Sequence, residues 1–138
     1  MKIVVIDGQG GSLGKALVEG IKERLDREIY AVGTNSIATS VMLKAGADFG
    51  ATGENPVVVN SRDADIITGP IGILAADSML GEITPKMATA VTASDAQKVV
   101  IPISRCKISV AGAVNLPFSE LVKIAVDRIC RYAEENDK

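Results

Sequence analysis

The sequence predicts one three-layer α/β domain with a mostly parallel sheet of five or six strands. Apolar, β-branched runs such as "KIVVID" are typical of strands that are buried on both faces. These runs alternate with stretches whose apolar residues recur at helical spacing. The 138 residues allow one domain, expected over residues 1–138 with the last few as a flexible tail. Together these observations indicate a small Rossmann-like domain.

The expected elements follow from local patterns along the chain. Strands are expected within residues 2–7, 27–36, 47–55, 63–73 and 96–104, with a possible sixth at 107–113. Helices are expected within residues 13–25, 36–46, 73–80 and 84–94, and from residue 117 onward. Thr84 before Pro85 is a helix start signal, and Gly46 is a helix stop. Segment 55–62 is ambiguous between a helical turn and a strand, and we favour the turn.

Composition narrows the classes of partner. The net charge is −2 and no long basic run occurs, so we expect neither a nucleic-acid nor a membrane partner. The N-terminal apolar run is too short for a signal peptide, which favours the cytoplasm. Aliphatic residues are abundant and aromatic residues make up 3%, which favours a homo-oligomer. Cys106 and Cys130 lack metal-binding spacing, and Cys130 fits a buried helix position.

The segment "DGQGGSLGK" joins the first strand to the first helix and is the main candidate for binding. The spacing G-x-x-G-x-x-G fits Gly8, Gly11 and Gly14, and it resembles a dinucleotide loop found in some Rossmann-type dehydrogenases. Backbone amides at such a helix start can hold a phosphate. We do not expect an ATP-hydrolysing P-loop, because Gln9 and Ala16 stand where that motif needs glycine and a hydroxyl. The glycines could instead serve only the turn and its packing. The predicted binding residues here are Asp7, Gly8, Gln9, Gly10, Gly11, Ser12, Leu13 and Gly14.

Other loops rich in small polar residues follow the later strands at the same sheet edge. Ligands of open parallel sheets bind at this edge, where the strand order reverses. The residues predicted to bind there are Thr34, Asn35, Thr52, Gly53, Glu54, Asn55, Gly69, Pro70, Ile71 and Gly72. The second strand ends without the acidic residue that usually holds the ribose of NAD. NAD, NADP, another adenine nucleotide, a mononucleotide and a sugar phosphate therefore all remain open as ligands.

The sequence offers no recognisable catalytic set. It contains no histidine, and neither tyrosine is followed by lysine at the Tyr-x-x-x-Lys offset. No metal cluster is visible, so we expect no metal. Asp7 is expected to cap amides of the glycine loop, although a ribose or metal contact stays open. The other candidate groups are Glu54, Asp77, Glu82, Arg105 and Lys107, and residues 78–82 are candidates for a wall of the site.

Several long motifs together resemble a small bacterial family catalogued as a domain of unknown function. They are "KIVVIDGQGGSLGKALVE", "AVGTNSIATSVMLKAGAD", "GATGENPVVVN", "ADIITGPIGI" and "DSMLGEITPKMA". The resemblance extends from Met1 to about Ile129. It implies a Rossmann-type, nucleotide-binding protein with no assigned reaction, and it supplies no catalytic residue.

Two functions of different classes remain on the sequence alone. The first is a nucleotide- or dinucleotide-binding module that senses or carries its ligand, with a phosphate held by the glycine loop. The alternative is a small oxidoreductase or sugar-phosphate enzyme whose site is completed by a second subunit. The sequence therefore leaves open whether the protein is an enzyme.

Overall fold

The computed structural model describes residues 1–103 and 107–136. The five strands are β1 (Ile3–Asp7), β2 (Ile29–Gly33), β3 (Phe49–Thr52), β4 (Ile66–Pro70) and β5 (Gln97–Ile101). The helices are α1 (Ser12–Arg24), α2 (Ser36–Lys44), α3 (Glu54–Ser61), α4 (Pro85–Ala93) and α5 (Phe118–Asn136), with one 3₁₀ turn, η1 (Ile71–Leu74).

The strands form one parallel sheet in the order β3-β2-β1-β4-β5. Central strand β1 pairs on both sides, with Ile3 opposite Ile29 of β2 and Ile66 of β4. The chain moves outward from β1 to β3 and then returns to β4, so the strand order reverses between β1 and β4. The predicted α/β fold is confirmed, and the reversal fixes where a ligand crevice is expected.

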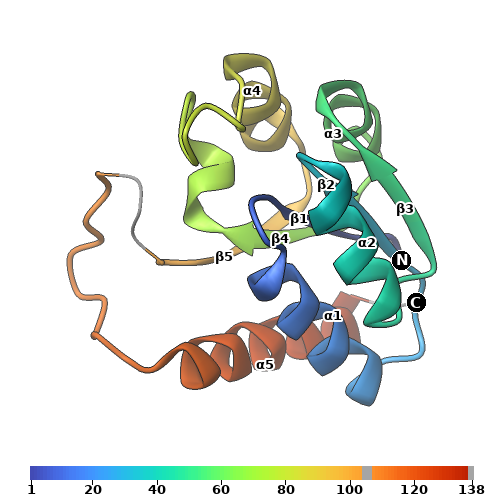
Figure 1. Ribbon diagram of the computed structural model, residues 1–138. Helices are drawn as coiled ribbons and strands as arrows, with labels where there is room; N and C mark the ends of the chain where they lie inside the picture. The colour runs from blue at the N-terminus through green and yellow to red at the C-terminus, as the bar shows by residue number, and fades with distance from the viewer. Residues whose placement is uncertain (104–106, 137–138) are drawn as a thin grey trace.

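Helices cover both faces of the sheet, as Figure 1 shows: α1 and α5 lie on one side, and α3 and α4 on the other. Alternate residues of β1 contribute to the two hydrophobic layers, one on each face of the sheet, because successive side chains of a strand point to opposite faces. Ile3 and Val5 pack towards α1 and α5, whereas Val4 and Ile6 pack towards α3 and α4. This arrangement explains why the strand sequence is apolar throughout rather than alternating.

Several helix boundaries follow the predicted signals. The Thr84 hydroxyl accepts a hydrogen bond from the Met87 amide at 3.1 Å, with Pro85 as the first residue of α4. Helix α2 ends at Lys44, and Gly46 follows with a φ of 118°. Residues 55–61 of the ambiguous segment 55–62 belong to α3, so the segment is helical, as we favoured, and forms more than a single turn.

Two expected elements are wrong. Segment 73–80 is not a helix: after η1 the chain makes irregular turns in which Asp77, Met79 and Leu80 have positive φ angles. Segment 107–113 forms no strand and belongs to a connection that runs outward from the sheet before α5 returns beneath it (Figure 1).

Helix α5 is amphipathic and packs along α1. Its buried residues include Val126, Ile129 and Cys130, which confirms the prediction of a buried thiol at Cys130. The helix continues to Asn136, so most of the expected tail is helical; the last two residues of the tail, 137–138, lie outside the described chain. No helix among the described residues is long and apolar enough to cross a membrane.

Candidate functional site

A cavity of about 270 Å³ opens at the carboxyl ends of β1 and β4, where the strand order reverses. It is lined by Asp7, Gly8, Gln9, Gly10, Gly11, Ser12, Leu13, Pro70, Gly72, Met79, Ile103 and Phe118. The structure thus brings the predicted loop 7–13 together with Pro70 and Gly72 around one space. We call this space the β4-side half of the crevice, and the region around Thr34 and Asn35, beyond the end of β2, the β2-side half.

Asp7 holds the two ends of the glycine loop together. Its Oδ1 accepts a hydrogen bond from the Gly8 amide at 2.8 Å, and its Oδ2 accepts one from the Gly14 amide at 2.6 Å. The side chain is buried, and desolvation raises its pKa above the ordinary 3.8 although both amides act in the opposite direction. The capping role predicted for Asp7 is confirmed by these two bonds.

The loop glycines are required for different reasons. Gly11 has a φ of 75°, and a Cβ there would come within 2.9 Å of the Ala38 backbone in α2. A Cβ on Gly14 would lie 2.9 Å from the Cβ of Asp7. Gly10 differs, because a Cβ at this position would meet no atom within 4 Å. Turn geometry and packing therefore explain Gly11 and Gly14 but leave Gly10 unexplained.

Three backbone amides of the glycine loop have no hydrogen-bond acceptor within the described chain. The first N–H groups of a helix have no acceptor within the helix. At α1, the Gly11 amide donates to the Gly8 carbonyl at 2.9 Å and Gly14 donates to Asp7. Within the described chain, the amides of Gly10, Ser12 and Leu13 donate no hydrogen bond. All three residues line the β4-side half, so this wall offers unpaired donors beside the positive end of the helix dipole.

In the β2-side half, the donors are satisfied by the protein's own Glu82. Its Oε1 accepts hydrogen bonds from Asn35 Nδ2 at 2.7 Å and from Thr34 Oγ1 at 2.8 Å. The Gln9 amide donates to both carboxylate oxygens, at 3.1 and 3.2 Å. Burial opposes ionisation of Glu82, but these hydrogen bonds outweigh it and lower the pKa below the ordinary 4.5. Glu82 is therefore a carboxylate at neutral pH.

Asn35 is positioned to serve this contact. Its Oδ1 accepts a hydrogen bond from the Ala38 amide at 2.9 Å and thereby caps α2. Its Nδ2 is then turned towards the glycine loop, where it donates to the Gln9 carbonyl at 3.0 Å as well as to Glu82. One side chain thus joins the start of α2, the glycine loop and the segment that carries Glu82.

Segment 75–82, which follows η1, crosses over the start of the glycine loop. A Cβ on Gly8 would lie 2.7 Å from the terminal methyl carbon of Met79 and would also collide with the Thr34 hydroxyl. The Ser78 hydroxyl hydrogen-bonds the Gly72 carbonyl, and the Asp77 amide donates to the Ile83 carbonyl at 2.7 Å. Segment 75–82 therefore covers Gly8 and separates the two halves of the crevice.

The predicted residues after β3 take part in contacts outside the cavity. Thr52 Oγ1 lies 2.8 Å from Thr39 Oγ1, and Glu54 Oε2 accepts a hydrogen bond from Thr84 Oγ1 at 2.6 Å. The Gly53 amide donates to the Gly33 carbonyl at 2.9 Å. Thr52, Gly53, Glu54 and Asn55 are absent from the cavity lining.

Two further predicted residues also point elsewhere. Gly69 is buried, and a Cβ there would collide with the Ile6 carbonyl, so strand packing explains this glycine. Ile71 lines a different cavity. Of the other candidate groups, Arg105 lies outside the described residues, as does Cys106, and Lys107 is exposed. Within residues 1–103 and 107–136, no three His, Cys, Asp or Glu residues are grouped to hold a metal ion.

The apolar wall of the β4-side half was only partly foreseen. Met79 belongs to the wall segment predicted from the sequence, whereas Ile103 and Phe118 were not among the predicted binding residues. Ile103 follows β5 at the same sheet edge, and this position in the sequence could have identified it as a residue of the site. Phe118 begins α5, and the sequence between β5 and α5 carries no signal that this residue returns to the crevice.

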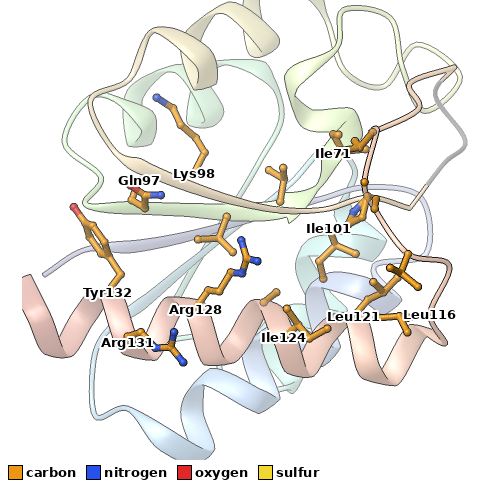
Figure 2. Close-up of a pocket in the computed structure, with 18 of the residues that line it drawn as sticks. Ile71, Gln97, Lys98, Ile101, Leu116, Leu121, Ile124, Arg128, Arg131 and Tyr132 are labelled. Atoms are coloured by element: carbon orange, nitrogen blue, oxygen red, sulfur yellow. The ribbon is translucent and has the colours of Figure 1, made fainter.

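A second cavity of about 810 Å³ lies between the outer edge of β5 and α5 (Figure 2). The figure shows apolar side chains, including Ile101 and Leu121, at one end of it. Polar side chains, including Lys98, Arg131 and Tyr132, lie towards the other end. No residue of the glycine loop lines this cavity.

Comparison with known proteins identifies the family. Residues 2–134 match the family described as domain of unknown function DUF3842. The chain belongs to this family. The resemblance drawn from its motifs is confirmed, and the family description assigns no reaction. No curated protein is significantly similar to the chain in sequence.

One similar solved structure is a dodecameric FMN-dependent UbiX-like decarboxylase from Escherichia coli O157:H7. It shares 20% sequence identity with this chain, with a TM-score of 0.49. The superposition covers 94% of this chain and 76% of that chain.

Proposed function

We propose that this DUF3842 protein binds a nucleotide in the β4-side half of the crevice, with a phosphate on the glycine loop. The observation that carries the proposal is the set of unpaired amides of Gly10, Ser12 and Leu13 at the start of the 13-residue helix α1. Unpaired N–H groups and the helix dipole favour an anion at this place. The cavity beside them supplies the space that a bare helix end lacks.

The opposite wall of the cavity suits a base or another flat ring. Met79, Ile103 and Phe118 supply an adaptable thioether side chain, a branched aliphatic group and an aromatic ring. Ligand sites commonly combine such an apolar wall with a few polar groups that fix orientation. A volume of about 270 Å³ is at the small end of ligand pockets, which favours a mononucleotide.

The proposal is tested by isothermal titration of the purified protein with AMP, ADP, FMN and inorganic phosphate. We expect saturable binding of at least one nucleotide, weakened at least tenfold by Gly10→Ala, because the added methyl group reduces the space beside the amides. Gly10→Ala leaves the fold intact, since a Cβ there meets no atom within 4 Å. Absence of binding by all four compounds would contradict the proposal.

We further infer a homo-oligomer, as the composition predicts. Support comes from apolar side chains that remain exposed on and beside the connection between β5 and α5, where Val110, Val114 and Phe118 are 44%, 69% and 43% exposed. Exposed apolar groups gathered in one region are typical of interaction sites. Sedimentation equilibrium measures the subunit number directly, and a monomer at high concentration would contradict this inference.

A further inference from the structure

The donors of the β2-side half are those that a second nucleotide unit would need. In dinucleotide-binding Rossmann folds, the end of β2 meets the ribose of one nucleotide while the pyrophosphate crosses the glycine loop. Here Thr34 and Asn35 at the end of β2 both donate to Glu82, and the Gln9 amide of the glycine loop does so as well. The protein's own carboxylate thus occupies this half of the crevice.

The path between the two halves is also covered. A dinucleotide approaches the first loop glycine closely, which is one reason that such loops contain glycine. At Gly8 the space above the backbone is taken by Met79 and the Thr34 hydroxyl. A ligand that extends from the β4-side half to the β2-side half must therefore displace both Met79 and Glu82.

We propose that Glu82 is a specificity-determining residue that keeps the β2-side half closed and restricts the crevice to ligands with one nucleotide unit. The inference rests on the proposed function, because it concerns nucleotides bound at the glycine loop. The proposal narrows the ligand class: the crevice binds a mononucleotide, such as AMP or FMN, and rejects a dinucleotide.

The Glu82 contacts hold segment 75–82 in a conformation that its sequence does not favour. Asp77, Met79 and Leu80 have φ angles of 66°, 58° and 57°, a region that costs a side-chain-bearing residue free energy. Leu80 is 98% exposed, so burial of its side chain does not compensate. The side-chain hydrogen bonds of Glu82 and Ser78 tie this turn to the glycine loop, to the residues after β2 and to η1.

The test compares AMP with NAD⁺ by isothermal titration of the wild-type protein, Glu82→Ala and Glu82→Gln. We expect wild-type protein to bind AMP at least tenfold more tightly than NAD⁺. Glu82→Ala is expected to raise the ratio of NAD⁺ affinity to AMP affinity at least tenfold; the ratio is the readout because Met79 of the same segment also lines the AMP site. Glu82→Gln keeps the shape of the side chain without its charge and is expected to raise NAD⁺ affinity by about threefold.

A matched control is Asp48→Asn. Asp48 also accepts hydrogen bonds from a backbone amide (Ile29, 2.7 Å) and a side chain (Lys22, 2.6 Å), and its pKa is lowered, mainly by Lys22. It precedes β3, at the opposite edge of the sheet. Asp48→Asn should change neither affinity, so an effect confined to Glu82 supports the proposal. Equal effects of both substitutions would contradict it.

The remaining outcomes separate the two proposals. If wild-type protein binds AMP and NAD⁺ equally, or if Glu82→Ala leaves the ratio of NAD⁺ affinity to AMP affinity unchanged or lowers it, nucleotide binding stands and the role of Glu82 is refuted. If no form of the protein binds either AMP or NAD⁺ and the wider nucleotide titration is also negative, the proposed function fails and this inference fails with it. Thermal unfolding of each variant verifies that it is folded before titration.

Discussion

The two halves of the crevice are built from the same glycine loop but differ in what their donors contact. On the β2 side, Thr34, Asn35 and the Gln9 amide all donate to the Glu82 carboxylate. On the β4 side, Gly10 and its neighbours line a cavity, and their amides donate to no group of the described chain. A glycine-rich loop therefore does not define a dinucleotide site by itself. A dinucleotide also needs both halves of the crevice to be free of the protein's own side chains.

The largest effect expected from this comparison concerns two adjacent glycines. Gly11→Ala should destabilise the protein by about 3 kcal/mol, because of its positive φ and the contact with the α2 backbone. That loss lowers Tm by roughly 10 °C for a domain of this size. Gly10→Ala should change stability by less than about 0.5 kcal/mol. Urea unfolding of both variants measures the difference, and equal losses would remove the distinction between a packed and an open side of the loop.

A smaller effect is expected from the charge in the β2-side half. Glu82→Gln should lower the free energy of unfolding by about 1 kcal/mol at pH 7, because neutral hydrogen bonds replace charge-assisted ones. The pKa of Glu82 is lowered in the folded protein, so its contribution is complete above the unfolded pKa and is lost as the pH falls through the folded pKa. The stability difference between the two proteins should therefore shrink below about pH 4.5.

A ¹³C titration of the side-chain carboxyl groups measures the pKa values of Glu82 and Asp7 directly. The midpoint for Glu82 should lie below 4.5, and that for buried Asp7 should lie above 3.8. A Glu82 midpoint at or above 4.5 would mean that the donors of the β2-side half do not hold a carboxylate.

The smallest effect is expected in segment 75–82, which separates the two halves. Leu80→Asn should stabilise the protein by about 0.5 kcal/mol, because asparagine tolerates a positive φ better than leucine and little burial is lost at this exposed site. Thermal unfolding of the variant provides the measurement. Leu43→Asn is the control, since Leu43 is 41% exposed but lies in regular helix, where no gain is expected.

Local sequence signals account for most of the fold. The Thr84-Pro85 start of α4, the Gly46 stop after α2 and the apolar runs of β1 to β5 depend on residues close together in the chain, and the structure confirms these predictions. Segment 73–80 is predicted as a short helix because Gly81 follows it as a helix stop. Its actual turns depend on contacts such as that of Ser78 with Gly72, which short-range periodicity does not encode.

The candidate site was less predictable than the fold, because its contacts join residues that are far apart in the sequence. The sequence placed loop 7–13 and Pro70 at one sheet edge, since all strands of a parallel sheet end there. The contact of Glu82 with Gln9 joins residues 73 positions apart, and the contact with Thr34 joins residues 48 positions apart. Glu82 was a candidate group from the sequence, but its partners could not be assigned without the three-dimensional arrangement.

The two hydrogen bonds of Asp7 have a consequence for the kinetics of binding. Because one buried carboxylate holds both Gly8 and Gly14, the intervening amides are fixed in direction before a ligand arrives. The conformational entropy of this loop is lost during folding and does not have to be lost again in the complex. The loop is preorganised, so we expect the proposed nucleotide to associate with the β4-side half without rearrangement of the glycine loop, in a single concentration-dependent phase.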